Sequence, residues 1–482
     1  MAGRELIESE LVVIGAGAAG LYCALTAASQ GATVTVISAT PLAQTASYWA
    51  QGGLAAALGE DDSPALHLAD TEKAGRGLVR RSAATLLVDE APAMIADLQE
   101  MRMRFDADAE GRLELGLEGG HSRRRIVHAG GSSTGRRLAR QLSAALVRHP
   151  GVTVLEGMRA SQLWTEDGRV VGVVCEDGLA VAARGTVIAT GGAAALWSRT
   201  TNPPGSIGIG IMLARNAGAA VADLEFVQFH PTAVVGVPGR EGFLITEAIR
   251  GEGATLVGPD GERFVEELAP RDEVARAIWD VMEQHGVSSV GLDMRSIGAG
   301  RFPNIEEALT QSGVDPSKQL IPVAPAAHYM MGGVVSDLNG ATNVEGLFVV
   351  GESACTGLHG ANRLASNSLS ECMVFGARAA LAAIDCSATD NGAPPEATEL
   401  QMPSLATREA MWRCAGLIRS REGLEELLDD PYPLAALIAR CGLAREESRG
   451  AHWRSDFPEL NSDLDSMHAV ITGDKPDFQR WL

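Results

Sequence analysis

The chain has 482 residues, of which 46% are hydrophobic and 21% are charged, a composition typical of globular rather than disordered proteins. This length exceeds what one hydrophobic core usually organises, so it favours two or three domains. The formal net charge of −21 argues against general affinity for nucleic acid or anionic lipid, because proteins that bind either usually present a basic face. A few buried arginines could still form a local site for an anionic substrate.

Seven cysteines are scattered along the chain without C-x-x-C spacing. This pattern argues against a disulfide framework or a zinc site and is typical of a reducing compartment. The N-terminal segment MAGRELIESE is too acidic for a secretory signal peptide, and no apolar run is long enough to span a bilayer. We therefore expect a cytoplasmic protein that binds neither nucleic acid nor membrane and has no metal site.

The first structural motif lies within residues 11–38, which predict a βαβ unit. A short apolar strand is followed by an Ala- and Leu-rich helix that ends at Gly31, and then by a β-branched second strand. Three glycines between the first strand and the helix form G-x-G-x-x-G, a loop that holds a dinucleotide pyrophosphate at a helix N-terminus. A glycine-rich turn without a ligand is the alternative, but the complete βαβ unit argues against it. The residues expected to contact the dinucleotide here are Gly15, Ala16, Gly17, Ala18, Ala19 and Gly20.

Farther along the chain, residues 80–150 predict mainly helices, interrupted by a polar stretch at 118–125. Apolar segments predict four more strands, at 152–155, 169–175, 186–189 and 347–350. Between the last two strands, residues 243–328 mix short helices, turns and Pro-bounded segments and suggest an inserted domain. A polar, Pro-containing linker at 389–404 precedes a region from 405 onward that is rich in Ala, Leu, Arg and Glu and predicts a small helical domain.

Two later motifs decide between NAD and FAD as the dinucleotide. Ser38 stands where an acid usually binds the ribose; it could bond a ribose hydroxyl or be an ordinary loop serine. Gly191 and Gly192 resemble the middle motif of two-dinucleotide-fold flavoproteins. Glu352, at the end of a second Gly-containing strand, resembles the acid that binds the ribityl chain in those proteins, the alternative being a solvent-exposed loop acid. The three motifs together favour FAD.

Longer segments carry a more specific resemblance. They are YWAQGG at 48–53, QFHPT at 228–232, LITE at 244–247, LAPRD at 268–272, PAAHY at 325–329 and LHGANRLASNSL at 358–369. In this order they resemble the flavoprotein superfamily of succinate dehydrogenase, fumarate reductase and L-aspartate oxidase, and within it the L-aspartate oxidase family. The resemblance covers most of residues 10–380 and returns at 447–450.

The resemblance implies FAD contacts in the loop at 46–53 and at Ser368 and Leu369. Superfamily members with covalently attached FAD carry a His at the position of Ala46, so FAD should be non-covalent here. Ile209 stands where the family often carries a cofactor-contacting Asp, so we expect one polar contact fewer. The residues of the flavin loop are Ala46, Ser47, Tyr48, Trp49, Ala50, Gln51, Gly52 and Gly53.

The resemblance also implies a dicarboxylate site. Arg363, His328, His230 and Thr246 should hold the substrate carboxylates, and Arg271 should be the proton donor or acceptor. An arginine stays protonated in water, so Arg271 makes better sense as an electrostatic clamp, or as an acid when fumarate is reduced.

One segment separates the subfamilies. The sequence EGGHS at 118–122 resembles aspartate oxidases, whereas the dehydrogenase and reductase flavoproteins generally carry a neutral Gln near this place. L-Aspartate differs from succinate by one ammonium group, with which the carboxylate of Glu118 could pair. The alternative for Glu118 is a surface acid beside a glycine turn.

The fold class implied is α/β. We expect an FAD-binding, Rossmann-like domain of the two-dinucleotide type, an inserted α+β capping domain and a C-terminal helical domain. The cap should supply Thr246 and Arg271, with His328 at the returning hinge, and should close over the flavin. The expected limits are 1–242 with 329–388 for the FAD-binding domain, 243–328 for the cap, 389–404 for the linker and 405–482 for the C-terminal domain.

The leading interpretation is oxidation of L-aspartate to iminoaspartate, with O2 or fumarate as electron acceptor, as the first step toward quinolinate and NAD. Quinolinate synthase is then the expected partner. The alternative is a soluble fumarate reductase or succinate dehydrogenase flavoprotein, against which Glu118, Ala46 and the helical C-terminal region argue. A catalytically inactive flavoprotein scaffold is the third hypothesis, and the presence of Arg271 and Arg363 argues against it.

Overall fold

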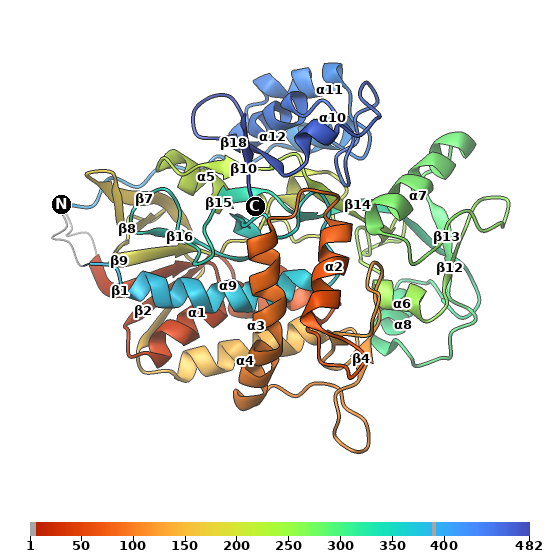
Figure 1. Cartoon of the computed structure of the whole chain (residues 1–482), viewed down its shortest axis with the longest axis horizontal. Coiled ribbons are helices and arrows are strands. Elements are labelled where there is room, and N and C mark those ends of the chain that lie inside the picture. The colour runs from red at the N-terminus through yellow and green to blue at the C-terminus, as the bar shows by residue number, and fades with distance from the viewer. Residues whose placement is uncertain (1–5, 388–391) are drawn as a thin grey trace.

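A seven-stranded sheet forms the centre of the computed structural model, which describes residues 6–387 and 392–482 (Figure 1). In order across the sheet, the strands are β6 (Val152–Glu156), β2 (Val34–Ser38), β1 (Leu6–Ile14), β9 (Ala180–Ile188), β8 (Arg169–Cys175) and β7 (Ala160–Glu166), with β16 (Leu347–Val349) also paired to β9. Strands β6, β2, β1, β9 and β16 pair in parallel, whereas β7 and β8 add an antiparallel hairpin. The parallel strands bring their carboxyl ends, where ligands bind in such sheets, to one edge.

Strand β1 is longer than the sequence pattern predicts. Residues 6–9 pair with residues 180–183 of β9, although only residues 11–14 form a continuous buried run. Because residues 6–10 stay partly exposed, the apolar pattern marks only the buried half of the strand. Strand β7 was not predicted, because its sequence ASQLWTE mixes polar and apolar residues without an apolar run.

Three helices pack against the parallel strands of the sheet, and two more lie outside them. Helices α1 and α9 pack against each other along the sheet, and α4 and α3 pack beside them (Figure 1). Their bounds are α1 (Ala18–Ser29), α2 (Pro64–Ala74), α3 (Arg81–Glu100), α4 (Thr134–Arg148) and α9 (Asn367–Ile384). Gly31 follows α1 with a φ of +91°, which confirms its predicted place at the end of the first helix. No helix within residues 6–387 and 392–482 is both long and apolar enough to cross a membrane.

The prediction of mainly helical structure over 80–150 is wrong for its central part. Between α3 and α4 the chain forms loops and two short strands, which join an earlier strand, from before α2, in a small three-stranded sheet. These strands are β3 (Leu54–Ala55), β5 (Ile126–Val127) and β4 (Leu115–Gly116). Glycines at 111, 116, 119 and 120 explain the departure, since glycine is unfavourable inside helices. The small sheet carries the polar stretch at 118–125 toward the centre of the molecule.

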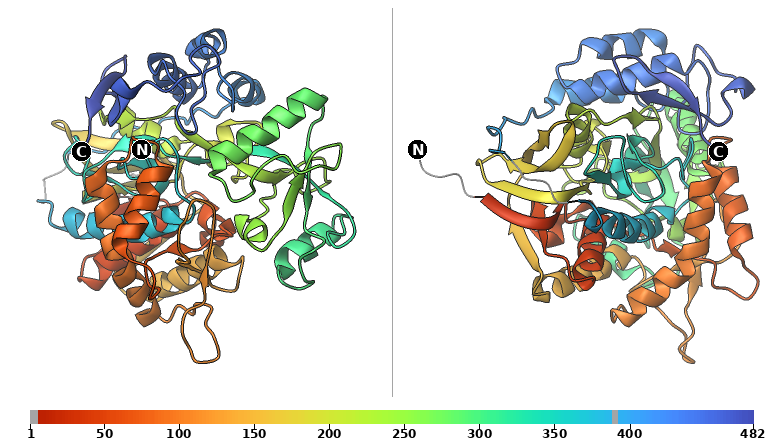
Figure 2. Two further views of the ribbon diagram at one scale, coloured as in Figure 1. Left: turned by 45° about the vertical axis from the view of Figure 1, so that its right-hand side comes forward. Right: turned by 60° about the vertical axis from the view of Figure 1, so that its left-hand side comes forward.

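A four-stranded antiparallel sheet forms the part that stands apart from the central sheet (Figure 2). Its strands in order are β11 (Val227–Val234), β14 (Ile321–Met330), β13 (Val290–Asp293) and β12 (Thr255–Val257). The helices associated with it are α6 (Glu247–Gly251), α7 (Arg271–His285) and α8 (Pro303–Thr310). The expected capping region at 243–328 lies within this part, but the supporting sheet begins earlier, at β11. The domain limits themselves stay a prediction.

The C-terminal region contains helices, as predicted, but it does not end as a helical domain. The chain continues into the antiparallel strands β18 and β19, and β18 pairs with β10 in a five-stranded sheet. The elements are α10 (Leu405–Cys414), α11 (Arg421–Glu426), α12 (Pro433–Ala444), β18 (Met467–Ile471) and β19 (Asp477–Arg480), with β10 (Val221–Ala222), β15 (Gly333–Val335) and β17 (Ala354–Cys355) completing that sheet. Of the predicted linker, residues 389–391 lie outside the described residues, and 392–404 form neither helix nor strand.

Candidate active site

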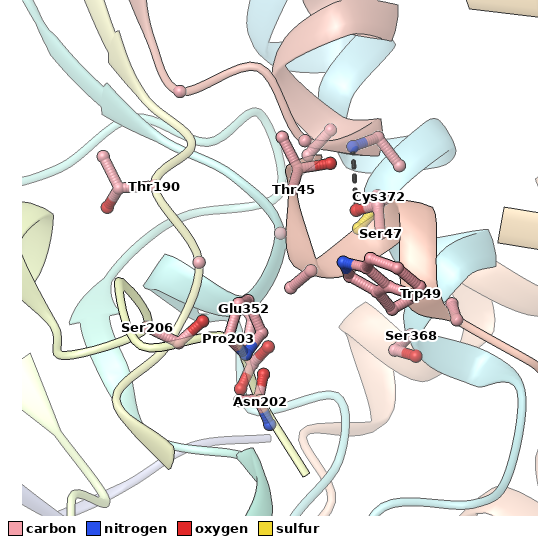
Figure 3. Close-up of a pocket in the computed structure, with 18 of the residues that line it drawn as sticks. Thr45, Ser47, Trp49, Thr190, Asn202, Pro203, Ser206, Glu352, Ser368 and Cys372 are labelled. Atoms are coloured by element: carbon pink, nitrogen blue, oxygen red, sulfur yellow. Dashed lines mark hydrogen bonds between the residues drawn. The ribbon is translucent and has the colours of Figure 1, made fainter. Parts of the chain in front are cut away.

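A deep cleft opens at the carboxyl ends of β1, β2, β9 and β16 and extends to the sheet that contains β11 and β14. Figure 3 shows part of it, where Ser47 and Trp49 face the segments that carry Thr190 and Ser206. A water-sized sphere can occupy about 330 Å³ of the cleft. Small-molecule pockets typically enclose about 300–1,000 Å³, so the cleft has the size of a ligand site.

The glycine-rich loop is packed as its motif predicts. A Cβ on Gly15, whose φ is +112°, would lie 2.3 Å from the carbonyl oxygen of Ala189, and a Cβ on Gly20 would lie 2.0 Å from that of Gly15. A Cβ on Gly17 would meet only the hydroxyl of Ser47, at 3.3 Å. Gly17 therefore faces the cleft, and the first turn of α1 presents N–H groups there that have no partner inside the helix.

Glu352 lies in the wall of the cleft rather than in a solvent-exposed loop. Its Oε1 accepts a hydrogen bond from the backbone N–H of Met330 at 2.9 Å. A Cβ on Gly192 would lie 2.4 Å from the same oxygen, so only glycine fits at that position. Burial raises the pKa of Glu352 to about 7. A half-buried carboxyl beside the glycine loop is suited to accept hydrogen bonds from a polyol such as a ribityl chain.

The far end of the cleft lies beyond β2. Ser38 is buried there and its hydroxyl donates to the carbonyl of Thr40 at 2.6 Å, so its role as a ribose ligand stays a prediction. Leu400 also lines the cleft, although its segment was expected to be only a linker. The nearby Thr398 hydroxyl donates to the carbonyl of Ser161 in β7 at 2.9 Å, which ties this segment to the edge of the central sheet. No sequence signal pointed to Leu400.

The loop at 46–53 runs along the middle of the cleft. The side-chain N–H of Gln51 donates to the carbonyl of Leu244 at 2.8 Å, which joins this loop to the capping region. Gln51 Oε1 is buried and has no hydrogen-bond partner within the described part of the chain. Such an oxygen is a natural acceptor for a ligand N–H. Trp49 is 62% exposed and stands at the mouth of the cleft.

Three predicted cofactor residues do not line the cleft. Gly20 and Gly192 act through the close approaches described above, and the ring of Tyr48 lies instead against Trp49, with ring centroids 5.2 Å apart, and near the guanidinium of Arg140. All the other predicted cofactor and catalytic residues do line it. Ile209, the first residue of α5 (Ile209–Asn216), presents an apolar side chain to the cleft. It therefore cannot make the polar contact that an Asp at this position would make.

Two buried arginines meet on one glutamine at the inner end of the cleft. The Nη1 of Arg271 and the Nη2 of Arg363 donate to Gln228 Oε1 at 3.1 Å and 3.2 Å. Arg363 also donates to the Ser368 hydroxyl at 2.6 Å and lies 4.3 Å from the ring centroid of Tyr329. Burial, with Arg271 close by, lowers the pKa of Arg363 to about 10, so its guanidinium stays charged at neutral pH. Gln228 begins the segment QFHPT, but no pattern in the sequence predicted this role for it.

Two histidines flank the arginines. The rings of His230 and His328 pack edge to face with centroids 5.1 Å apart. Burial and the neighbouring arginines hold both pKa values well below the ordinary value for histidine, so both rings are neutral. His230 Nδ1 accepts from the backbone N–H of Thr232 at 3.2 Å, which places the ring proton on Nε2. His328 Nδ1 shares a hydrogen bond of 2.8 Å with the hydroxyl of Thr201.

A buried ionic chain runs from the cleft into the capping region. Arg271 Nε donates to Glu247 Oε2 at 2.7 Å, and Glu247 Oε1 lies 3.3 Å from Arg250 Nη2. Burial alone would raise the pKa of Glu247, but Arg271 and Arg250 hold it below its ordinary value. A Cβ on Gly119 would lie 2.1 Å from Glu247 Oε1, which explains a glycine beside Glu118. Glu247 is the last residue of the segment LITE and Arg250 follows it, but neither was predicted as a site residue.

Glu118 is not a surface acid. It is 3% exposed and lines the cleft, and its Oε2 accepts a 2.6 Å hydrogen bond from the Ser366 hydroxyl. Its Oε1 lies 3.8 Å from His128 Nε2 and would be 3.6 Å from a Cβ on Gly52 in the flavin loop. The structure therefore brings the Glu118 carboxylate into the cleft that holds the two arginines. No group of three or more His, Cys, Asp or Glu side chains in the described residues is arranged to bind a metal ion.

Comparisons with known proteins cover nearly the whole chain. Residues 10–369 match the FAD binding domain family, and residues 427–480 match the family described as fumarate reductase flavoprotein C-term. The L-aspartate oxidase of Agrobacterium fabrum is 46% identical over 94% of this chain and 92% of its own length. The L-aspartate oxidase of Caulobacter vibrioides is 46% identical over 97% of both chains, and that of Streptomyces coelicolor is 40% identical over 98% of this chain and 94% of its own.

Solved structures of related flavoproteins superpose on the chain. A mutant of E. coli quinol fumarate reductase FrdA has a TM-score of 0.89 and 28% identity, covering 99% of this chain and 97% of that one. Mycobacterium smegmatis Sdh1 has a TM-score of 0.83 and 29% identity, covering 98% of this chain and 94% of that one. The comparisons confirm the α/β fold class and the FAD-binding domain expected from the three glycine-containing motifs.

Proposed function

Because the chain belongs to the L-aspartate oxidase family of FAD-binding flavoproteins, we propose that it oxidises L-aspartate to iminoaspartate with O2 or fumarate as the electron acceptor. The observation that carries this proposal is the buried carboxylate of Glu118 in the cleft that holds Arg271 and Arg363. The arginines suit the two carboxylates of any C4 dicarboxylate. A carboxylate there that is not paired with an arginine suits a substrate that also carries an ammonium group.

Two carboxylates, Glu118 and Glu247, line this end of the cleft together with Arg271 and Arg363. Glu247 is already paired with Arg271 and, behind it, with Arg250. Glu118 is bonded to the neutral hydroxyl of Ser366 instead, so its charge is available to a substrate ammonium group. Aspartate carries such a group, whereas fumarate and succinate do not.

The residues of the outer cleft fit FAD. Gly15 and Gly17 allow a pyrophosphate to approach α1, Glu352 offers a carboxyl to the ribityl chain, and Gln51 Oε1 offers an acceptor without a partner in the described residues. When bound, FAD supplies the acceptor for the two electrons and the hydrogen that leave the substrate Cα. Ala46 presents only a methyl group, so we propose that the chain holds FAD without a covalent bond.

The inner cleft is organised before substrate binds. Gln228 holds the guanidinium groups of Arg271 and Arg363 in fixed positions, so little side-chain entropy is lost when they bind carboxylates. His230 carries its ring proton on Nε2 and can donate it to a carboxylate oxygen. Thr246 precedes α6 without capping it, which leaves its hydroxyl for the substrate. Several donors aimed at two carboxylates fix the orientation of Cα.

Arg271 acts during oxidation as a charged clamp, because a guanidinium stays protonated. In the direction of fumarate reduction it can donate a proton from its guanidinium. Glu247 accepts a hydrogen bond from Arg271 Nε and faces Arg250, so it can pass a proton from Arg250 to Arg271 after that donation. The low pKa of Glu247 keeps it a carboxylate between transfers.

Anaerobic reduction of the bound flavin tests the proposed function. L-Aspartate added to the purified, FAD-loaded protein without oxygen should bleach the visible absorption of oxidised flavin, and fumarate added afterwards should restore it. Bleaching by succinate but not by aspartate would establish the alternative, a fumarate reductase or succinate dehydrogenase type of flavoprotein. A flavin spectrum that neither compound changes would establish an inactive scaffold.

We propose three further assignments around this activity. Iminoaspartate hydrolyses in water, so a direct consumer such as quinolinate synthase, on the route to NAD, would protect it.

All seven cysteines are free thiols, which supports a reducing, cytoplasmic setting. The region at 243–328 acts as a cap, a role supported by Thr246 and Arg271, which it contributes to the cleft, and by the bond from Gln51 to Leu244.

Leu400 gives a test of the cofactor end of the cleft. Leu400→Asp should raise the dissociation constant of FAD roughly ten- to a hundredfold, because it removes an apolar contact worth about 1.5–3 kcal/mol and places a carboxylate on the side of an anionic cofactor. Titration of the apoprotein with FAD, followed by flavin fluorescence, measures this constant. Leu405→Asp is the matched control, since Leu405 is 80% exposed at the start of α10. Equal FAD affinity in the two variants would remove Leu400 from the cofactor site.

A further inference from the structure

Ser366 connects the flavin loop to Glu118. Its hydroxyl oxygen accepts from the backbone N–H of Gly53 at 3.1 Å and lies 2.6 Å from Glu118 Oε2. A backbone N–H can only donate and a carboxylate can only accept. The single proton of the hydroxyl must therefore point to Glu118, so the direction of both hydrogen bonds is fixed.

This arrangement divides the two oxygens of Glu118 between two tasks. Oε2 is committed to Ser366, while Oε1 is directed toward Gly52 of the flavin loop. The carboxylate is held in one rotamer, because a short hydrogen bond to a charged acceptor is strong and directional. Oε1 therefore remains available on the side where the substrate would lie.

The backbone of Ser366 is held in an unusual conformation to make this contact. Its φ is +61°, in the left-handed region, which residues other than glycine seldom adopt. Bonds on both sides hold it there: the carbonyl of Ala365 accepts from His121 Nε2 at 2.8 Å, and the carbonyl of Ser366 accepts from Ala55 N–H at 3.3 Å. Strained residues that the surrounding structure holds in place are typical of functional sites.

The loop that carries Glu118 is anchored separately. Arg125 forms buried ion pairs with Asp62 at 2.8 Å and Asp70 at 2.6 Å, and Asp70 also accepts from the backbone N–H and hydroxyl of Ser122. These contacts fix the backbone of the loop, whereas Ser366 fixes the end of the Glu118 side chain. A substitution at Ser366 can therefore change the orientation of the Glu118 side chain without disturbing the backbone of its loop.

We propose that Ser366 is a positioning residue that gives the site its preference for an ammonium-bearing dicarboxylate, by orienting Glu118 against the flavin loop. This inference rests on the proposed function. Ser366 acts through Glu118, so it should influence aspartate and leave the carboxylate contacts of fumarate unchanged. It explains why a serine occupies a position whose backbone conformation favours glycine.

Two substitutions separate the hydroxyl from the backbone. Ser366→Gly removes the hydroxyl and relieves the left-handed conformation, whereas Ser366→Ala removes the hydroxyl and keeps the strain. Both variants, loaded with FAD, should lose roughly tenfold in kcat/KM for aspartate oxidation, the expected effect of a misplaced charge-assisted contact. Fumarate reduction with chemically reduced flavin should change less than about twofold. FAD content and Tm of Ser366→Gly should match the parent protein, because glycine suits this backbone.

A double variant gives the decisive comparison. In a Glu118→Gln background, Ser366→Gly should change the ratio of the two activities no further, because its effect passes through the carboxylate. Equal loss of both reactions in Ser366→Gly, or a wild-type ratio, would overturn the proposal. A parent protein whose flavin aspartate does not reduce would instead overturn the proposed function and this inference together, whereas an active parent whose ratio responds to Glu118→Gln but not to Ser366→Gly overturns this inference alone.

Discussion

Arg363→Ala should nearly abolish both aspartate oxidation and fumarate reduction, with kcat/KM reduced roughly 10²- to 10⁴-fold for each. Arg363 is a buried guanidinium held by Gln228 and Ser368, with its Nε unpartnered within the described part of the chain. Two charge-assisted contacts to a carboxylate, each worth about 1.5–3 kcal/mol, account for a loss of this size. Both substrates present the same carboxylates, so both reactions should fall together. Steady-state kinetics of the two reactions on FAD-loaded protein measure the effect.

Two further variants show whether that loss is due to the charge and shape of the Arg363 guanidinium. Arg363→Lys keeps the positive charge but loses the planar fork, so its activity should lie between those of Arg363→Ala and the parent protein. Arg81→Ala removes an arginine whose side chain is 66% exposed, outside the cleft, and should leave both activities unchanged. Survival of either reaction in Arg363→Ala, with FAD content intact, would show that another cation binds the shared carboxylates.

The dinucleotide end of the molecule could be predicted from local sequence because its requirements are local. Gly15 and Gly20 lie in the same loop and first helical turn. A side chain on Gly20 would collide with a backbone atom of this βαβ unit, and one on Gly15 with a backbone atom just after the neighbouring strand. Predicting Gly192 and Glu352 required a resemblance, since they approach each other across 160 residues of sequence and only the fold brings them together. The same holds for the predicted dicarboxylate residues, which the structure gathers into one cleft.

What sequence reasoning missed consists mainly of supporting contacts between distant segments. Gln228 joins two arginines that stand 43 and 135 positions away, and Glu247 lies between Arg271 and Arg250 in the interior. A glutamine or glutamate in such a place has no periodicity or spacing that marks it. Leu400 was missed for a different reason: the polar, Pro-containing composition of its segment indicates only an irregular chain, not the surface it covers.

For two acidic residues, the sequence could not decide between a surface loop and the site, and the structure decides it. Glu118 and Glu352 could each have been exposed loop acids, and both lie in the cleft. Neither residue lies in a helix or strand with a clear apolar face, so no pattern could report its burial. The terminal strands β18 and β19 were mistaken for helix because β18 is stabilised by pairing with β10, more than two hundred residues earlier in the chain.

Glu118→Gln should change which substrate the enzyme prefers. The substitution keeps the size of the side chain and an oxygen that can accept from Ser366, but removes the charge that would pair with the substrate ammonium. Aspartate oxidation should fall roughly ten- to a hundredfold in kcat/KM, the expected loss of one charge-assisted contact of about 1.5–3 kcal/mol. Fumarate reduction should be unchanged or faster, because fumarate has no ammonium and a dianion gains from one positive charge more at the inner cleft.

The informative quantity is the ratio of the two activities in one protein preparation, since it cancels differences in FAD content. Glu90→Gln is the matched control: Glu90 is paired with Arg378 at the surface, with 42% of its side chain exposed, and its loss should leave the ratio unchanged. Equal decreases in both activities would mean that Glu118 supports the cleft without discriminating between substrates. No decrease in either activity would favour the fumarate reductase alternative. The Glu118 carboxylate would then have no ammonium group to bind in the substrate.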